Sequence, residues 1–266
     1  MGRRICILLF VFLFGASTTV FAQSGDPSWG VYQVTENTTT PLLTNRPERV
    51  RPIASITKLM TGWITLTSQP TLSQLVTITT QDTRDASTTV LRSRDRVSIE
   101  TLIYLMLVSS DNVAARALAR TVEGTRDAFV ARMNRTAEQL YMVDTHYADP
   151  AGLLAGNVST VTDIIRLLGA VTSTPLLSDA FHTQTYTATI QRNTRTHRLT
   201  VRNTNRLLDD SMHISKTGFT SAAGYCLVQW ITAPERSYVT VVLGAPSKDY
   251  RLGLMQALMQ FIQPRY

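Results

Sequence analysis

The chain has 266 residues, of which 44% are hydrophobic and 17% are charged, and its formal net charge is +7. This length is sufficient for one large domain or two intermixed lobes. The positive charge is modest and spread along the chain, and no basic run is interleaved with aromatic residues, so the composition argues against nucleic acid binding.

The N-terminus has the pattern of a secretory signal peptide over residues 1–22. A pair of arginines forms its charged start, an apolar core follows over 5–14, and small residues precede a cut at Gln23. The apolar run is too short for a comfortable membrane span, although an uncleaved anchor is the alternative, and no second candidate span is present. Cleavage would leave one domain over 23–266, with no membrane span and a net charge of +5, because two arginines and no acids are removed.

Two residue types are informative by how seldom they occur. Cys6 leaves with the signal peptide, so Cys226 is the only thiol of the mature chain and no intrachain disulfide is possible. Cys226 stands in an apolar run and is expected to be a small buried hydrophobe. The four histidines are scattered without metal-ligand spacing, so we expect no metal site and no cofactor.

Hydrophobic periodicity and turn residues predict the secondary structure in chain order. The expected elements are strands at 29–35 and 41–44, a helix at about 55–66, a short strand at 75–79, helices at 98–107, from 112, and at 125–140, 160–171 and 175–181, strands within 186–201 and at 212–215, 224–232 and 238–244, and a closing helix at 248–263. The polar, Arg-rich stretch 81–96 is expected to be a surface excursion. Strands at both ends with helices between them predict an α/β fold, in which an antiparallel sheet is flanked by helices and carries a helical insert.

Helix ends and faces add detail to this prediction. Ser98 is expected to cap the helix that follows it, and residues 160–163 resemble a capping box with Asp in place of Glu. The closing helix is expected to pack on the core rather than to lie on a membrane, through a face that consists of Leu252, Met255, Met259 and Ile262.

A Ser and a Lys one helical turn apart, Ser55 and Lys58, carry the first indication of chemistry. A Ser hydroxyl becomes a good nucleophile when a neighbour takes its proton. Lys58 can do so only if it is neutral, so its pKa must fall from about 10.4 to roughly 7–8, which burial and a second cation would favour. The alternative is a surface Ser beside a solvated Lys. The chain has 26 basic residues of which only three are Lys, so a Lys at this position is suggestive.

Two tripeptides extend this pattern. Ser110-Asp111-Asn112 lies at a break between two predicted helices, and Lys216-Thr217-Gly218 follows a predicted strand. Ser-x-x-Lys, Ser-Asp-Asn and Lys-Thr-Gly in this order form the signature of penicillin-binding proteins and serine β-lactamases.

The three motifs suggest a division of labour. Ser55 attacks a peptide carbonyl with Lys58 as its base, and Ser110 relays a proton to the leaving amine. Asp111 is expected to brace its loop, with a direct role as a base as the alternative. The groups expected to bind substrate are Asn112, Lys216, Thr217, Gly218 and Phe219, the last of which would share an oxyanion hole with the backbone N–H of Ser55.

From about Trp29 to Ile262 the sequence resembles the D-alanyl-D-alanine peptidases of the low-molecular-mass penicillin-binding proteins. The segments that carry the resemblance are 54–61, 149–153 with Asn157 and Ser159-Thr160, and 213–224, and the last is most similar to the penicillin-binding protein 7 group of D-alanyl-D-alanine endopeptidases. The resemblance implies a β-lactamase/transpeptidase-like fold and a periplasmic wall hydrolase. It also implies that peptidoglycan stem peptides are its substrates and that β-lactam antibiotics are its covalent inhibitors.

Several alternatives stay open at this stage. A D-alanyl-D-alanine carboxypeptidase would differ only in its leaving group, and a non-catalytic penicillin or wall sensor would use the same pocket. The chain ends about fifty residues after Lys216, which leaves no room for the β-rich second domain of larger carboxypeptidases and favours the endopeptidase group. Fast β-lactam hydrolysis is not expected, because neither Glu123 nor Glu138 is followed by the Glu-x-x-Leu-Asn pattern of class A β-lactamases.

Overall fold

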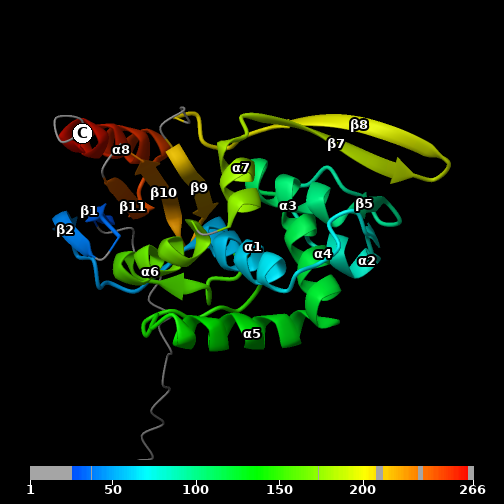
Figure 1. Cartoon of the computed structure of the whole chain (residues 1–266), viewed down its shortest axis with the longest axis horizontal. Coiled ribbons are helices and arrows are strands. Elements are labelled where there is room, and N and C mark those ends of the chain that lie inside the picture. Colours follow the sequence, from blue (N-terminus) through cyan, green and yellow to red (C-terminus); the bar gives the residue numbers. More distant parts are fainter. Residues whose placement is uncertain (1–25, 37, 173, 208–211, 233–235, 263–266) are drawn as a thin grey trace, which may run out of the picture.

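The two ends of the chain meet in one five-stranded antiparallel sheet, in the order β2-β1-β11-β10-β9 (Figure 1). The computed structural model describes residues 26–36, 38–172, 174–207, 212–232 and 236–262, so the predicted signal peptide lies outside the described residues. The strands of this sheet are β1 (Ser28–Val34), β2 (Thr39–Asn45), β9 (Met212–Thr220), β10 (Gly224–Thr232) and β11 (Ser237–Ala245). Because β9 forms one edge, its outer side is available to the helical part of the molecule.

The closing helix α8 (Lys248–Ile262) covers one face of the sheet. Its buried face consists of Arg251, Met255, Leu258 and Ile262. The predicted core packing is thus confirmed, but the predicted face is wrong by part of a turn, since Leu252 and Met259 are only partly buried. Arg251 also belongs to the buried face, although arginine is usually exposed.

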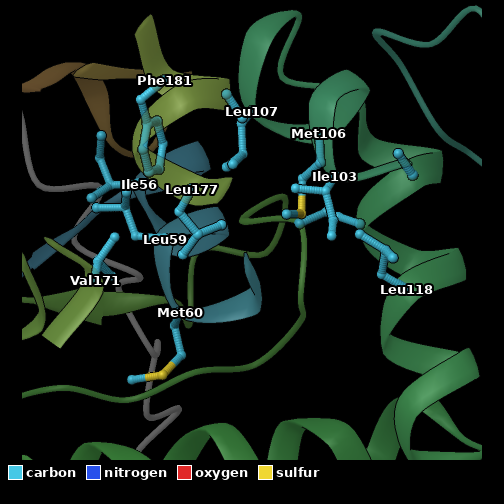
Figure 2. Close-up of a cluster of buried hydrophobic side chains, with 14 of the residues drawn as sticks. Ile56, Leu59, Met60, Ile103, Met106, Leu107, Leu118, Val171, Leu177 and Phe181 are labelled. Atoms are coloured by element: carbon cyan, nitrogen blue, oxygen red, sulfur yellow. The ribbon is translucent and has the colours of Figure 1, made fainter. Parts of the chain in front are cut away.

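The other face of the sheet packs against a larger helical body. Its helices are α1 (Lys58–Thr67), α3 (Ile99–Val108), α4 (Asn112–Glu123), α5 (Arg126–Gln139), α6 (Val161–Thr172) and α7 (Pro175–His182). Helix α1 lies in the middle of this body. Figure 2 shows Ile56 and Leu59 near labelled side chains of α6 and α7, and Met60 belongs to the same apolar cluster. The segment that carries Ser55 and Lys58 is therefore fixed by apolar packing on several sides.

A second, smaller sheet has the order β4-β5-β7-β8. Its strands are β4 (Leu75–Thr77), β5 (Arg96–Ser98), β7 (Thr185–Arg192) and β8 (Arg195–Arg202), and the long β7–β8 ribbon extends over the helical body (Figure 1). A two-stranded pairing of β3 (Arg51–Pro52) with β6 (Val158–Ser159) joins the segment before Ser55 to the loop before α6.

The predicted helix caps are confirmed in one case and half confirmed in the other. The Ser98 side chain accepts a hydrogen bond from the backbone N–H of Thr101, as expected of an N-cap. Thr160 accepts from the N–H of Asp163 at 3.1 Å, but the Asp163 carboxylate accepts from the N–H of Asp144 at 2.9 Å and pairs with Arg166. Its carboxylate thus ties two segments together instead of completing the box.

The stretch 81–96 is more than the surface excursion that was predicted. A short helix, α2 (Thr80–Thr83), begins with a complete capping box between Thr79 and Asp82. Asp95 is fully buried and forms a salt bridge of 2.7 Å with Arg192 of β7. The sequence misleads here because charged residues can be buried when they are paired.

Among the described residues no single helix is long and apolar enough to cross a membrane. Only α6 and α7 taken together, which are bent by 110° relative to each other, have the length and composition of a possible span.

Candidate active site

Ser55 lies on a short 3₁₀ turn, η1 (Ala54–Thr57), immediately before α1. Ala54 has a φ of 47°, in the left-handed region that a residue with a Cβ seldom adopts. The turn is held there by its neighbours, because a Cβ on Gly218 of β9 would stand 3.0 Å from the carbonyl oxygen of Ile53 and 3.2 Å from the amide nitrogen of Ser55. The edge strand and the turn can approach this closely only because position 218 is a glycine.

The Lys58 side chain is fully buried and has three hydrogen-bond partners. Its Nζ lies 2.8 Å from Ser55 Oγ, 2.8 Å from Asn112 Oδ1 and 2.6 Å from the carbonyl oxygen of Ala151. Asn112 Oδ1 and the Ala151 carbonyl can only accept, so they take the two N–H groups of a neutral amine. The nitrogen lone pair then remains for the Ser55 hydroxyl, which is the arrangement a general base requires.

Burial lowers the pKa of Lys58 to about 7, against the opposing attraction of Asp149 and Asp111. The second cation that favours this shift is Arg116. Lys58 itself contributes to lowering the pKa of Lys216, after burial, so a proton on either amine disfavours one on the other.

The loop after Asp149 positions the Ala151 carbonyl. The buried Asp149 carboxylate accepts five hydrogen bonds of 2.7–3.3 Å, from the backbone N–H groups of residues 151–154 and from Asn157 Nδ2. Gly152 has a φ of 81°, and a Cβ there would stand 2.0 Å from the carbonyl oxygen of Ala54. The loop therefore packs directly against the turn of Ser55. The family resemblance marked this segment, but residue types alone did not reveal its use, because the atom that contacts Lys58 belongs to the backbone.

The Ser110-Asp111-Asn112 motif lies at the break between α3 and α4, as predicted. Ser110 adopts a φ of 61°. The Asp111 carboxylate accepts from the N–H groups of Ala114 at 2.9 Å and Val90 at 3.1 Å, so it braces the loop as expected. The Asn112 amide contacts Lys58 with its oxygen and donates to the carbonyl of Ser87 at 2.5 Å with its nitrogen, which fixes its orientation.

Lys216, Thr217 and Gly218 lie within β9, which continues to Thr220, and not after a strand as predicted. The Lys216 side chain is almost fully buried, and its Nζ donates to Ser110 Oγ at 2.9 Å and to the Thr217 carbonyl at 3.1 Å. The strand was predicted too short because Lys-Thr-Gly lacks the apolar alternation typical of a strand.

These elements enclose a cleft of about 300 Å³. The structure brings all eight predicted site residues together: six line the cleft, whereas Lys58 and Lys216 lie beneath it and contact Ser55 and Ser110. The lining residues that sequence reasoning missed are Ser87, Thr88, Gly152, Leu153, Thr204, Thr220, Tyr225, Lys248 and Arg251.

Two of the missed residues, Lys248 and Arg251, are cations on α8. The Arg251 guanidinium carbon lies 5.8 Å from the centre of the Tyr225 ring, and that ring lies 4.3 Å from the ring of Phe219. Lys248, on the same helix, is exposed. The sequence held one signal for Lys248, because the chain has only three lysines and all three lie at this site. In the part of the chain that the structure describes, no group of three or more His, Cys, Asp or Glu residues is arranged to hold a metal ion.

Comparison with known proteins agrees with this geometry. A family model described as D-alanyl-D-alanine carboxypeptidase matches residues 27–247. The D-alanyl-D-alanine endopeptidase of Pseudomonas aeruginosa is 35% identical over 264 residues, covering 93% of this chain and 84% of the relative. That of Escherichia coli K12 is 35% identical over 238 residues, covering 88% and 76%. The Streptomyces K15 DD-transpeptidase has a similar structure, with a TM-score of 0.81 at 27% identity, covering 87% of this chain and 95% of that one.

Proposed function

Because the chain belongs to the D-alanyl-D-alanine carboxypeptidase family and is a serine DD-peptidase, we propose that it is an endopeptidase that cleaves the cross-links between peptidoglycan stem peptides through an acyl-enzyme on Ser55. The predicted family and transpeptidase-like fold are confirmed. The observation that carries the proposal is the buried Lys58 amine, 2.8 Å from Ser55 Oγ, with carbonyl oxygens as its other two partners. The choice of an endopeptidase rests on the relatives at 35% identity, whereas the carboxypeptidase DacD of E. coli K12 is 30% identical.

Acylation begins with transfer of the Ser55 proton to the Lys58 lone pair as Ser55 Oγ forms a bond to the D-Ala carbonyl carbon. The carbonyl oxygen becomes an oxyanion, which the backbone N–H groups of Ser55 and Phe219 stabilise. When the C–N bond breaks, the leaving nitrogen takes the proton of the Ser110 hydroxyl, and Ser110 takes one from the Lys216 ammonium, 2.9 Å away.

This relay requires a proton on Lys216, although burial lowers the pKa of that amine. A substrate carboxylate in the cleft supplies the compensating charge, since an anion beside a buried amine favours its protonated form. Thr217 contributes a hydroxyl to the same carboxylate, and Arg251 a guanidinium. Correctly bound substrate thus favours the charged form of Lys216.

Deacylation reverses the roles. A water molecule gives a proton through Ser110 to the now neutral Lys216, and its oxygen attacks the acyl carbon. The C–O bond to Ser55 breaks, and Ser55 Oγ takes back its proton from Lys58. Both lysines then have their starting protonation states, and no other group is consumed.

The test is a digest of purified cross-linked muropeptides with the mature protein and with a Ser55→Ala variant. We expect dimers to be converted to monomers by the parent protein only. Trimming of pentapeptides to tetrapeptides without loss of dimers would instead identify a carboxypeptidase. Intact mass after addition of benzylpenicillin should show a lasting adduct on the parent and none on the variant. Adduct formation without cleavage of any muropeptide would favour the sensor alternative.

The substrate also determines where the enzyme has to act. We propose that the chain is exported to the periplasm and cleaved before Gln23, as the charged start and apolar core of residues 1–22 indicate. N-terminal sequencing of the protein from a periplasmic fraction should begin at Gln23, and an intact N-terminus would favour the anchor instead.

A further inference from the structure

A second cavity, of about 800 Å³, adjoins the cleft at the loop after Asp149. Leu153 lines both cavities. Its neighbour Gly152 is so close to the nucleophile that a Cβ on it would stand 3.0 Å from the amide nitrogen of Ser55. The second cavity therefore begins within about two residues' length of the reacting centre, since successive Cα atoms are about 3.8 Å apart.

The walls of this cavity come from α2, α4, the start of α5 and Leu153-Leu154, and they are rich in arginine. Its charged lining residues are Arg84, Arg116, Arg120 and Arg126 together with Asp82, Asp85 and Asp127. Two of these cations are already paired: Arg120 binds Asp82 at 2.8 Å, and Arg126 binds Asp127 at 3.2 Å.

Arg116 and Arg84, unlike Arg120 and Arg126, have no carboxylate partner among the described residues. The Arg116 guanidinium donates to the carbonyl oxygens of Asp82, at 3.2 Å, and of Arg84, and among the described residues it forms no ion pair. No ion pair involves the exposed Arg84 either, so two guanidinium charges face one unpaired acid, Asp85, within this part of the structure. A guanidinium held by backbone carbonyls keeps its charge and is positioned to receive an anion.

The cavity also has an apolar part, because Leu154 is 51% exposed beside the partly buried Leu153. Small apolar side chains and carboxylates on one extended chain would complement this combination. A stem peptide has that chemistry, with alanine methyl groups and the free carboxylate of a γ-linked D-glutamate. Three extended residues reach roughly 10 Å, so such a chain could be acylated at Ser55 and extend past Leu153.

We propose that this arginine-lined cavity is a subsite for the carboxylate-bearing residues of the stem peptide whose D-Ala is transferred to Ser55. The inference rests on the proposed function, since it assigns the rest of the same substrate. It makes the free carboxylates of the stem a determinant of specificity, with Arg84 and Arg116 as the residues that recognise them.

The test measures binding without turnover, by calorimetry on the mature Ser55→Ala protein. The probes are a stem tetrapeptide with free side-chain carboxylates and the same peptide with those carboxylates converted to amides. We expect the acid to bind about tenfold more tightly than the amide, and the ratio to fall at least threefold when Arg84→Gln is added and at 0.5 M salt. Arg198→Gln is the matched control, because it removes one exposed arginine from β8, outside both cavities.

Equal binding of acid and amide, or a ratio that Arg84→Gln and Arg198→Gln reduce alike, would overturn the proposal. The second result would mean that the preference comes from net charge and not from the cavity. Because this assay needs no cleavage, its outcome is separate from the muropeptide digest. A digest that fails while the binding ratio responds to Arg84 would count against the proposed reaction and not against the subsite.

Discussion

The two walls of the cleft are built by opposite means. The helical wall presents Ser55 and Ser110 where regular structure is interrupted, and Ala54 and Ser110 have φ angles of 47° and 61°. The sheet wall presents Thr217, Gly218 and Phe219 within β9, which pairs with β10 in the main antiparallel sheet. The two serines proposed to exchange protons thus belong to irregular backbone, whereas most of the predicted binding groups belong to a regular strand.

This difference follows from what each wall has to hold. A left-handed residue other than glycine costs of order 1–3 kcal/mol, and it persists only where the surroundings over-determine it. Here the constraints are the apolar packing of η1 and α1, the Asp149 loop, and the contact with Gly218. A strand needs no such support, because its own ladder fixes the direction of each side chain. Damage to the helical wall should therefore reduce chemistry most, and damage to the sheet wall less.

The largest effect should come from removing the base. Lys58→Met keeps the length of the side chain without an amine, and we expect acylation by benzylpenicillin to fall by about 10²–10⁴-fold. The measurement is the second-order rate of adduct formation by intact mass, with thermal unfolding as the check on folding. A folded variant that is acylated at the parent rate would remove Lys58 from the mechanism and leave the helical wall without its base.

Gly152→Ala tests the backbone of the helical wall. The new Cβ would collide with the Ala54 carbonyl, and the φ of 81° is unfavourable for alanine, so we expect the free energy of unfolding to fall by about 3 kcal/mol or more. Gly169→Ala is the matched control, because a Cβ there meets nothing within 4 Å and the exposed helical site should gain about 0.5–1 kcal/mol. Equal stability of the two variants in urea unfolding would show that the loop can rearrange around the new Cβ without a loss in the free energy of unfolding.

The pH dependence of acylation measures the helical wall directly. Only the neutral Lys58 amine accepts a proton, so with a pKa of about 7 the rate should rise about tenfold per pH unit up to that value and level off above it. The unfolded chain holds this proton up to about pH 10.5, so between about pH 7 and 10.5 the unfolded state binds more protons and the Lys58 contribution to stability increases with pH. A rate that is flat between pH 5 and 8 would contradict the assignment.

The same contrast explains what could be predicted from the sequence. The fold class and most elements followed from periodicity, from three motifs and from the resemblance they carry, and the eight residues predicted for the site lie together at one cleft. Functional side chains can be recognised from their residue types. The Ala151 carbonyl and the left-handed turns belong to the backbone, which residue types do not reveal. Arg251 was missed for a related reason, since its burial depends on how α8 packs on a sheet assembled from distant segments.

The smallest expected effect concerns the place where the two walls touch. In Gly218→Ala the new Cβ would stand 3.0 Å from the Ile53 carbonyl oxygen and 3.2 Å from the Ser55 amide nitrogen, so β9 must move away by a few tenths of an ångström. We expect a loss of about 1 kcal/mol in stability and about tenfold in acylation, because movement of β9 displaces the Phe219 amide, which is one of the two proposed oxyanion donors. Gly253→Ala, on an exposed turn of α8 with nothing within 4 Å, is the control. If acylation is unchanged while stability falls, the sheet wall supports the fold alone, and the Ser55 amide keeps its position without β9.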